Sequence, residues 1–185
     1  MIEAELKARL SDPGGVRSAL AGRSDGERAT YHDTYFDTPE ESLERDGKEL
    51  RLRTVESAGS VRHMLTVKEQ VFDATSGSKP EHETSVAEPA AVVHMLKALG
   101  YGPVIDFTKH CENYRFTAQG LQMLATVVVV PEIDGTFLEV ESLVEERDVE
   151  SALGAIRTVM TQLGVDHASL TTELYTDAVR AARRH

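Results

Sequence analysis

The sequence predicts an α+β protein: a closed, eight-stranded antiparallel β-barrel with helices packed on the outside. Several segments alternate between charged and apolar residues at the period of a β-strand. Short turn-forming stretches separate these segments, and helical spacing is confined to a few places. The charges on the alternating segments come in matched sets at alternate positions, such as Glu-x-Glu-x-Lys, Arg-x-Arg and Glu-x-Glu. The 185 residues predict one domain, strand-rich over 1–145 with intervening helices and helical over 148–183.

The first segment, IEAELKARL over 2–10, allows two interpretations. Its residues are good helix formers, and Glu3 and Lys7 are spaced as a stabilising helical pair. Its strict alternation instead favours a strand with one charged and one apolar face. LRLR at 50–53 and FLEVE at 137–141 share that alternation, and their apolar residues recur at two rather than at three and four. We therefore predict that the first segment is also a strand.

The remaining elements follow from composition and spacing. The segments around Gly59 form a predicted hairpin, because two alternating runs flank a short glycine-containing turn. Apolar residues at helical spacing, several ending in glycine, mark the helices. The other predicted strands are 30–38, 48–55, 62–71, 80–86, 121–130 and 136–143, and the predicted helices are 14–22, 89–100, 149–164 and 170–184.

The charged faces of these strands have two possible destinations. On an open sheet they would face solvent, whereas in a barrel covered by helices they would converge on an interior channel. The grouping of like charges at alternate positions favours the channel. The residues expected on its wall are Lys7, Arg9, Arg51, Arg53, Lys68 and Lys109 among the cations, and Glu3, Glu5, Glu81, Glu83, Glu139 and Glu141 among the acids.

Such a wall is costly to bury unless ligands neutralise it. Arginines two apart on one face repel each other, and an anion between them relieves both, since guanidinium groups bind phosphate oxygens with two parallel hydrogen bonds. Crowded carboxylates are relieved by a hard divalent cation such as Mg²⁺ or Mn²⁺. A polyphosphate with bound metal satisfies both groups. The net charge of −11 argues against general nucleic-acid binding.

The segment Glu3-Ala4-Glu5-Leu6-Lys7 resembles the N-terminal ExExK signature of the CYTH family, also called triphosphate tunnel metalloenzymes. That family includes class IV adenylyl cyclases and thiamine triphosphatases. One short motif is weak, but an ordered set is specific. The resemblance continues in order through YFDTP at 35–39, LRLR at 50–53, TVKE at 66–69, EHE at 81–83, Lys109 and FLEVE at 137–141, with Tyr175 near the end of the helical tail.

The resemblance implies an eight-stranded tunnel that binds a triphosphate through basic residues and Mg²⁺ or Mn²⁺ through glutamates. Glu81 and Glu83 would help to position metal, water or a basic side chain. The candidate substrate-binding residues are Lys7, Arg9, Arg51, Arg53, Lys68, Lys109 and Arg115. The candidate catalytic residues are Glu5, Lys7, Arg51, Arg53, Lys68 and Lys109, and the candidate metal ligands are Glu3, Glu5, Glu81, Glu83, Glu139 and Glu141.

The sequence departs from the family pattern at two places. Family members often have Lys-x-Arg where this chain has Lys109 followed by His110 and Cys111. Because a thiol cannot replace a guanidinium, Arg115, at the same strand parity, is the candidate substitute. Family members also often have an aspartate on the strand before the last Glu-x-Glu, where this chain has TVVVV at 126–130. These departures imply an altered substrate or weak activity.

Three functions remain open. The compact chain and the GTFLEVE segment resemble the class IV adenylyl cyclase branch, in which the ribose 3′-hydroxyl attacks the α-phosphorus and pyrophosphate leaves. The alternative is a triphosphatase that hydrolyses inorganic, thiamine or nucleoside triphosphate, and the second alternative is a non-catalytic nucleotide or polyphosphate binder. We expect a small-molecule triphosphate partner, no nucleic acid, no membrane and a homodimer. The lone cysteine and the lack of a long apolar run predict a cytoplasmic protein.

Other chemistry-bearing residues are expected to be structural. Strand parity points His82 away from the face of its glutamate neighbours. Cys111 is predicted to be a small buried hydrophobe rather than a nucleophile. Tyr31, Tyr35 and Phe36 could face an entering ring, but we expect at least two of the three to pack in the core.

Overall fold

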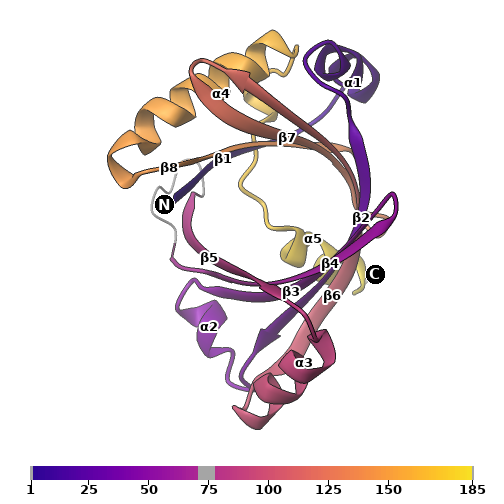
Figure 1. The fold of residues 1–185 in the computed structure, drawn as a ribbon, viewed down its shortest axis with the longest axis vertical. Helices are drawn as coiled ribbons and strands as arrows, with labels where there is room; N and C mark the ends of the chain where they lie inside the picture. The colour runs from indigo at the N-terminus through magenta and orange to yellow at the C-terminus, as the bar shows by residue number, and fades with distance from the viewer. Residues whose placement is uncertain (1, 71–77, 185) are drawn as a thin grey trace.

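The protein is an eight-stranded barrel with helices on its outer surface, as seen in a computed structural model that describes residues 2–70 and 78–184 (Figure 1). Every neighbouring pair of strands is antiparallel, and the order around the barrel is β1-β5-β4-β3-β2-β6-β7-β8. The predicted closed barrel is therefore confirmed. The strands are β1 Ile2–Arg9, β2 Glu27–Asp37, β3 Glu49–Ser57, β4 Ser60–Lys68, β5 Lys79–Val86, β6 Gly102–Ala118, β7 Leu121–Val129 and β8 Phe137–Val144.

Helices cover the barrel unevenly. Figure 1 shows α4 running along the outside of β1 and β8, while α3 lies at the opposite side of the barrel. α1 begins after Asp12, whose side chain accepts a hydrogen bond from the amide of Gly15 at 3.0 Å, an ordinary N-cap. The helices are α1 Pro13–Ala21, α2 Ser42–Arg45, α3 Pro89–Ala98, α4 Val149–Gln162 and α5 Tyr175–Ala182, with short 3₁₀ turns at Glu146–Asp148 and His167–Ser169. No helix among the described residues combines the length and the apolar character needed to cross a membrane.

The N-terminal segment is a strand, as predicted, and its two faces have different surroundings. The apolar residues Ala4 and Leu6 are buried in the cluster beneath α4, where Ile156 and Val159 also lie. Glu3 and Glu5 project to the other side, into the barrel. The same division holds for β8, so the main hydrophobic core lies between barrel and helix rather than inside the barrel.

Three elements differ from the prediction. β6 is the longest described strand at 17 residues, yet the sequence marked it only through the shared parity of Lys109 and Arg115. Residues 42–45 form α2, where no helix was predicted. α5 begins at Tyr175 rather than at residue 170, because Leu170 bridges to Ala8 of β1 and holds the preceding segment extended. The last residue of the predicted strand 62–71, residues 73–77 of the turn-forming stretch DATSGSKP (73–80) and the two terminal residues of the chain lie outside the described residues.

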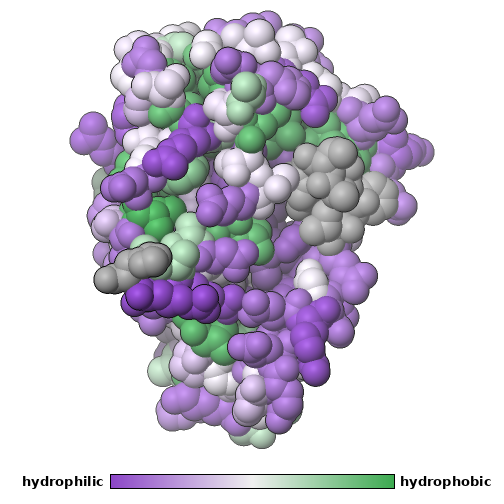
Figure 2. All heavy atoms as spheres, turned by 180° about the vertical axis from the view of Figure 1, so that it is seen from behind, coloured by the Kyte–Doolittle hydropathy of each residue, from purple (hydrophilic) through white to green (hydrophobic). Residues whose placement is uncertain are grey.

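Seen from behind, the surface is mostly hydrophilic, with hydrophobic side chains in patches between charged ones (Figure 2). The segment from Thr171 to Thr176 closes one end of the barrel. The amide of Thr171 donates to the carbonyl of Lys7 at 2.8 Å, and Tyr175 enters the barrel at the start of α5. The segment therefore covers one end of the barrel.

Candidate active site: a charged tunnel

A charged tunnel inside the barrel holds two cavities. One of about 110 Å³ lies at the covered end, and one of about 260 Å³ lies further along the barrel. Both belong to one site because the same charged residues line them. The residues shared by the two cavities are Glu3, Glu5, Arg51, Lys68, Lys109 and Glu139.

Arg51 and Lys68 form one cationic part of the wall, held in place by glutamates of β5. The Arg51 guanidinium lies 3.8 Å from Glu81 and 3.9 Å from Glu83, and the Lys68 ammonium lies 3.0 Å from Glu81. The Arg51 Nε has no hydrogen-bond partner among the described residues, although it is buried. A buried donor of this kind is costly unless a ligand accepts from it. Glu81 and Glu83 thus contact cations, and Glu81 also interacts with Glu3: burial and a side-chain hydrogen bond with Glu3 raise the pKa of Glu81 to about 7.

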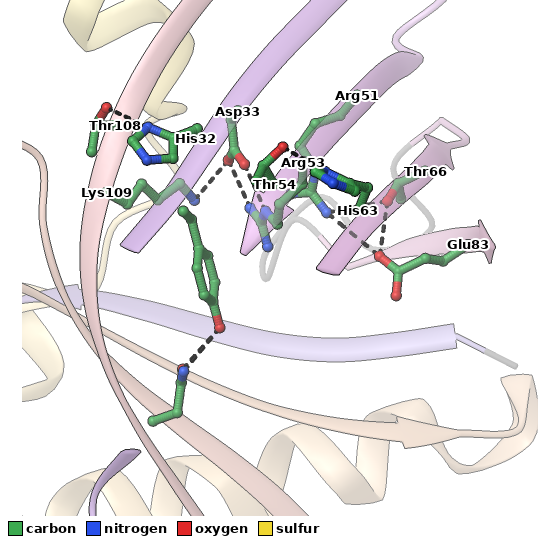
Figure 3. A network of polar contacts seen from close by, with 12 residues as sticks. His32, Asp33, Arg51, Arg53, Thr54, His63, Thr66, Glu83, Thr108 and Lys109 are labelled. Atoms are coloured by element: carbon green, nitrogen blue, oxygen red, sulfur yellow. Dashed lines mark hydrogen bonds and ion pairs between the residues drawn. The ribbon is translucent and has the colours of Figure 1, made fainter. Parts of the chain in front are cut away.

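Arg53 and Lys109 form a second cationic part and share one carboxylate. Figure 3 shows Asp33 between them, with Arg53 donating from Nε at 2.6 Å and from Nη2 at 2.7 Å. The Lys109 ammonium lies 3.8 Å from the same carboxylate. Burial opposes ionisation of Asp33, but Arg53 outweighs it and holds the pKa of Asp33 well below its usual range. Asp33 is therefore ionised throughout the physiological pH range.

Three glutamates crowd together on β1 and β8. Glu5 and Glu141 are opposite each other in the sheet register, and Glu3, Glu5 and Glu141 can each place a carboxylate oxygen within 4.8 Å of the others. Burial together with the charges of Glu139 and Glu3 raises the pKa of Glu5 to about 8. Burial and Glu3 likewise raise the pKa of Glu141 well above its usual value. An oxygen-only cluster under mutual repulsion fits a hard divalent cation.

Glu3 and Glu139 differ from Glu5 and Glu141, because nearby lysines lower their pKa values. Glu3 also lies 2.9 Å from the Lys68 ammonium, and this charge outweighs burial and holds the pKa of Glu3 well below its usual value. Glu139 pairs with Lys7 across β1 and β8 in the register, beside the three-glutamate cluster. Burial opposes ionisation of Glu139, but Lys109 and Lys7 lower its pKa. Glu139 is thus a carboxylate at the junction between the acidic cluster and the cations.

The covered end adds a tyrosine and an ion pair. The Tyr175 ring lies 4.6 Å from the Lys7 ammonium and 4.4 Å from that of Lys109, within cation–π range of both. Lys7 also donates to the backbone carbonyl of Glu173. Lys79 lines the same cavity and forms an ion pair with Glu49. Five cations, four lysines from four different strands and one arginine, line this cavity: Lys7, Arg51, Lys68, Lys79 and Lys109.

The comparisons with known proteins agree with this geometry. The model of the family described as CYTH domain matches residues 1–175. The chain belongs to the CYTH family. A relative named adenylate cyclase CyaB, from Aeromonas hydrophila, is 32% identical over 115 residues, which are 60% of this chain and 56% of the relative. The match thus spans little more than half the length of that CYTH relative.

Solved CYTH-like structures share the fold at low sequence identity. The PH1819 protein of Pyrococcus horikoshii OT3 superposes with a TM-score of 0.82 at 21% identity, covering 98% of this chain and 99% of that one. A Vibrio parahaemolyticus protein described as a candidate adenylate cyclase has a TM-score of 0.82 at 19% identity, covering 97% and 98%. HpAC1 of Hippeastrum, described as having a dominant triphosphatase activity, has a TM-score of 0.69 at 18% identity, covering 98% and 96%.

Two of the residues predicted to bind substrate lie away from the centre of the CYTH tunnel. Arg9 is exposed beyond its end, lines neither cavity among the described residues, and donates to the carbonyl of Asp134 at 3.0 Å. Arg115 is exposed and lines only the wider cavity. Their strand parity is right, but their depth along the barrel is not that of the central cations. Arg115 lies further along β6 than Cys111 and lines the wider cavity together with Lys109.

Uncharged side chains line the tunnel at the two places where this CYTH chain departs from the family pattern. Cys111 is buried on the tunnel wall, as predicted, and burial raises the pKa of its thiol to about 12. Thr126 also lines the tunnel and donates to the Asn113 side chain at 3.0 Å, while that amide donates to the Tyr31 hydroxyl at 2.9 Å. A neutral hydrogen-bonded group thus occupies this part of the wall.

His82 and the three aromatic residues of β2 have different surroundings. His82 is 71% exposed at its side chain, outside the tunnel, as strand parity predicted. Tyr35 stacks on Phe107 with ring centroids 5.8 Å apart, and Phe36 is buried in a separate core cluster. Both are buried in the core, as expected for two of the three aromatics, and Tyr35 also lines the cavity at the covered end. Tyr31 instead lines the tunnel, where the Arg53 guanidinium lies 4.6 Å from its ring.

Sequence reasoning missed three charged residues of the site. Asp33 lies within the aromatic-rich segment 30–38, opposite Arg53 in the sheet register. The available signal was its strand parity, because Asp33 lies on the same strand face as Tyr31. Lys79 lies two residues before Glu81 on the same strand face, so the alternation rule could have included it. Glu49 precedes Arg51 by two and could have been found in the same way.

Proposed function

We propose that this CYTH chain is a metal-dependent enzyme that converts ATP to cyclic AMP and pyrophosphate in the tunnel. The observation that carries the proposal is the juxtaposition of two kinds of charge in one buried channel. Cations that suit a polyphosphate and a cluster of three glutamates that suits a divalent cation line the same space. The adenylate cyclase name of the Aeromonas hydrophila relative supports the choice of reaction.

The chain would act by positioning and charge neutralisation. Arg51, Lys68 and Lys109 line both cavities and would bind the phosphate oxygens along the chain. A divalent cation held by the Glu3, Glu5 and Glu141 carboxylates would neutralise charge on the phosphates. The ribose 3′-oxygen would then bond to the α-phosphorus as the bond from that phosphorus to the β-bridging oxygen breaks. The electron pair leaves with pyrophosphate, and the 3′-hydroxyl proton is released.

A second candidate is hydrolysis of a triphosphate. HpAC1, which shares the fold, is described as having a dominant triphosphatase activity. The covered end of the tunnel also concentrates cations around a small cavity that suits a terminal phosphoryl group without an organic part. In this reaction the oxygen of water would bond to the terminal phosphorus and the bridging oxygen would leave with its electron pair on the diphosphate.

Incubation of the purified chain with ATP and either Mn²⁺ or Mg²⁺ separates these functions. Equal amounts of cyclic AMP and pyrophosphate support the cyclase, whereas orthophosphate without cyclic AMP supports the triphosphatase. Arg51→Met protein, purified in parallel, identifies product made by a contaminating enzyme. Binding of ATP with no product under either metal would contradict both reactions and leave a non-catalytic binder.

We predict that Glu141→Gln raises the Mn²⁺ concentration for half-maximal activity by at least about tenfold, since losing support at a metal site commonly costs 10- to 100-fold in affinity. The fold should be retained, because the change removes a repelling charge from the cluster with Glu3 and Glu5. The measurement is a Mn²⁺ titration of product formation, with thermal unfolding in EDTA. Glu112→Gln, which removes a carboxylate paired with Arg17 outside the tunnel, is the matched control. An unchanged titration for Glu141→Gln would exclude this residue as a metal ligand.

A further inference from the structure

Asp33 is an acidic residue inside a site built for a polyanion. Its side chain is 0% exposed, at the centre of β2, and it lines neither tunnel cavity among the residues described. Arg53 and Lys109, which do line the tunnel, lie between the Asp33 carboxylate and the space where a ligand would bind. Asp33 can therefore act on a ligand only through these two cations.

The carboxylate fixes the orientation of Arg53. It accepts two hydrogen bonds, from Nε at 2.6 Å and Nη2 at 2.7 Å, which uses one edge of the planar guanidinium. The same guanidinium lies over the ring of Tyr31, 4.6 Å from the ring centroid. With one edge and one face occupied, the guanidinium has a single arrangement in which its remaining N–H groups are available to the tunnel.

Lys109 is held in a similar way. Its ammonium lies 3.8 Å from the Asp33 carboxylate and 4.4 Å from the centroid of the Tyr175 ring. The two contacts come from different elements, β2 and the start of α5. A flexible four-carbon side chain is thereby confined before any ligand arrives, which lowers the ordering cost of binding.

Two roles for Asp33 can be distinguished by the sign of its effect on binding. A carboxylate behind the wall lowers the positive charge that the tunnel presents, so it weakens the attraction for a triphosphate. If it contributes to turnover, it does so by orienting the cations, since a misplacement of about 1 Å can cost about 100-fold in rate. Orientation and attraction therefore predict opposite changes in kcat and in affinity.

We propose that Asp33 is a positioning residue, which orients the Arg53 guanidinium and the Lys109 ammonium for catalysis on the bound triphosphate. This role rests on the proposed triphosphate function. Asparagine at this place cannot reproduce the contact, because its amide NH₂ would face an N–H of Arg53 where the carboxylate offers a second acceptor. The substitution thus removes the orientation and one negative charge together.

The test compares Asp33→Asn with Asp37→Asn, a matched change on the same strand. Asp37 accepts hydrogen bonds from the amides of Leu43 and Glu44 at the start of α2, and it lines neither tunnel cavity. We expect Asp33→Asn to lower kcat with ATP and Mn²⁺ by at least about tenfold while KM stays unchanged or falls. Asp37→Asn should leave both constants unchanged. A kcat within twofold of the wild type, or a raised KM with unchanged kcat, would overturn the positioning role.

A double variant keeps the inference testable if Asp33→Asn folds poorly. Removing both members of a buried pair is less disruptive than removing one, so Asp33→Asn combined with Arg53→Gln should fold more readily. If Asp33 acts through Arg53, its substitution should lower kcat less in the Arg53→Gln background than in the wild type. Equal reductions in the two backgrounds would overturn that pathway.

A separate readout distinguishes failure of this inference from failure of the proposed function. Calorimetric titration with inorganic tripolyphosphate in EDTA tests whether the wild type binds a triphosphate at all. The Arg53 Nε–H resonance, assigned in ¹⁵N spectra with Arg53→Gln, tests orientation without turnover. We expect a sharp resonance in the wild type and in Asp37→Asn, and its loss in Asp33→Asn. If the wild type binds tripolyphosphate but releases no product, the proposed function fails, and an unchanged resonance in Asp33→Asn would overturn the positioning role as well.

Discussion

Replacement of Arg51 by methionine is expected to weaken triphosphate binding by about 100-fold. Arg51 lines both cavities, and its buried Nε has no partner among the described residues, so a phosphate oxygen would be its natural acceptor. Loss of two charge-assisted hydrogen bonds corresponds to about 3 kcal/mol, or about two orders of magnitude in the dissociation constant. Methionine retains most of the apolar stem, so packing against the barrel wall is largely kept.

The measurement is calorimetric titration of inorganic tripolyphosphate and of ATP at one fixed ionic strength, because these interactions are screened by salt. Arg17→Met is the matched control, since Arg17 pairs with Glu112 outside the tunnel. We expect the control to bind as the wild type does. Thermal unfolding checks that the fold is intact in Arg51→Met, because the change also removes an ion-pair partner of Glu81 and Glu83. Wild-type affinity in Arg51→Met would remove this residue from the binding site.

The barrel and its charged interior followed from one local rule, the period-two alternation of strands. The rule gives the face of each residue, and barrel closure brings the charged faces together. It therefore placed Glu3, Glu5 and Arg51 in one channel. The same rule does not give depth along the barrel axis, which is why Arg9 and Arg115, at the right parity, lie away from the central cations.

Pairing between opposite charges depends on contacts that no local pattern encodes. Glu81 and Glu83 carry the same alternation as the clustered glutamates, yet the sheet register places Glu81 beside Lys68 and Glu83 beside Thr66 of β4. Their carboxylates consequently contact cations and a hydroxyl, and Glu81 reaches the acidic cluster only through Glu3. Register is fixed by turn geometry and by the whole sheet, so it could not be assigned from these segments alone.

The limits of β6 were obscured for a related reason. Its tunnel face changes from apolar at Ile105 and Phe107 to charged at Lys109, so no single alternation runs its length. Asn113 and Tyr114 are adjacent and both buried, one toward the tunnel group and the other in the core beneath the helices. A strand enclosed on both sides along part of its length lacks the clear polar face on which the prediction relied.

The second large effect concerns stability rather than binding. We expect Asp33→Asn to lower the free energy of unfolding at pH 7 by about 3–5 kcal/mol, because breaking a buried ion pair leaves an uncompensated charge. Arg53, whose side chain is 14% exposed, would lose its ion pair and one of its two hydrogen bonds to the side chain at position 33. Asp37→Asn should cost only about 1 kcal/mol, as expected for loss of a helix-capping side chain. Urea unfolding at pH 7 measures both differences.

The deficit of Asp33→Asn should shrink on acidification, and this dependence identifies the charge as its cause. The pKa of Asp33 is held well below its usual range in the folded protein, chiefly by Arg53 acting against burial. Its ionisation therefore stabilises the fold above the unfolded-state pKa of about 4, and this contribution is lost as the pH falls through the folded-state value. Asparagine does not titrate, so the wild type approaches the variant in stability as the pH is lowered from 7 to 3. A deficit that is equal at both pH values would instead indicate loss of packing, because packing does not depend on the protonation of this carboxylate.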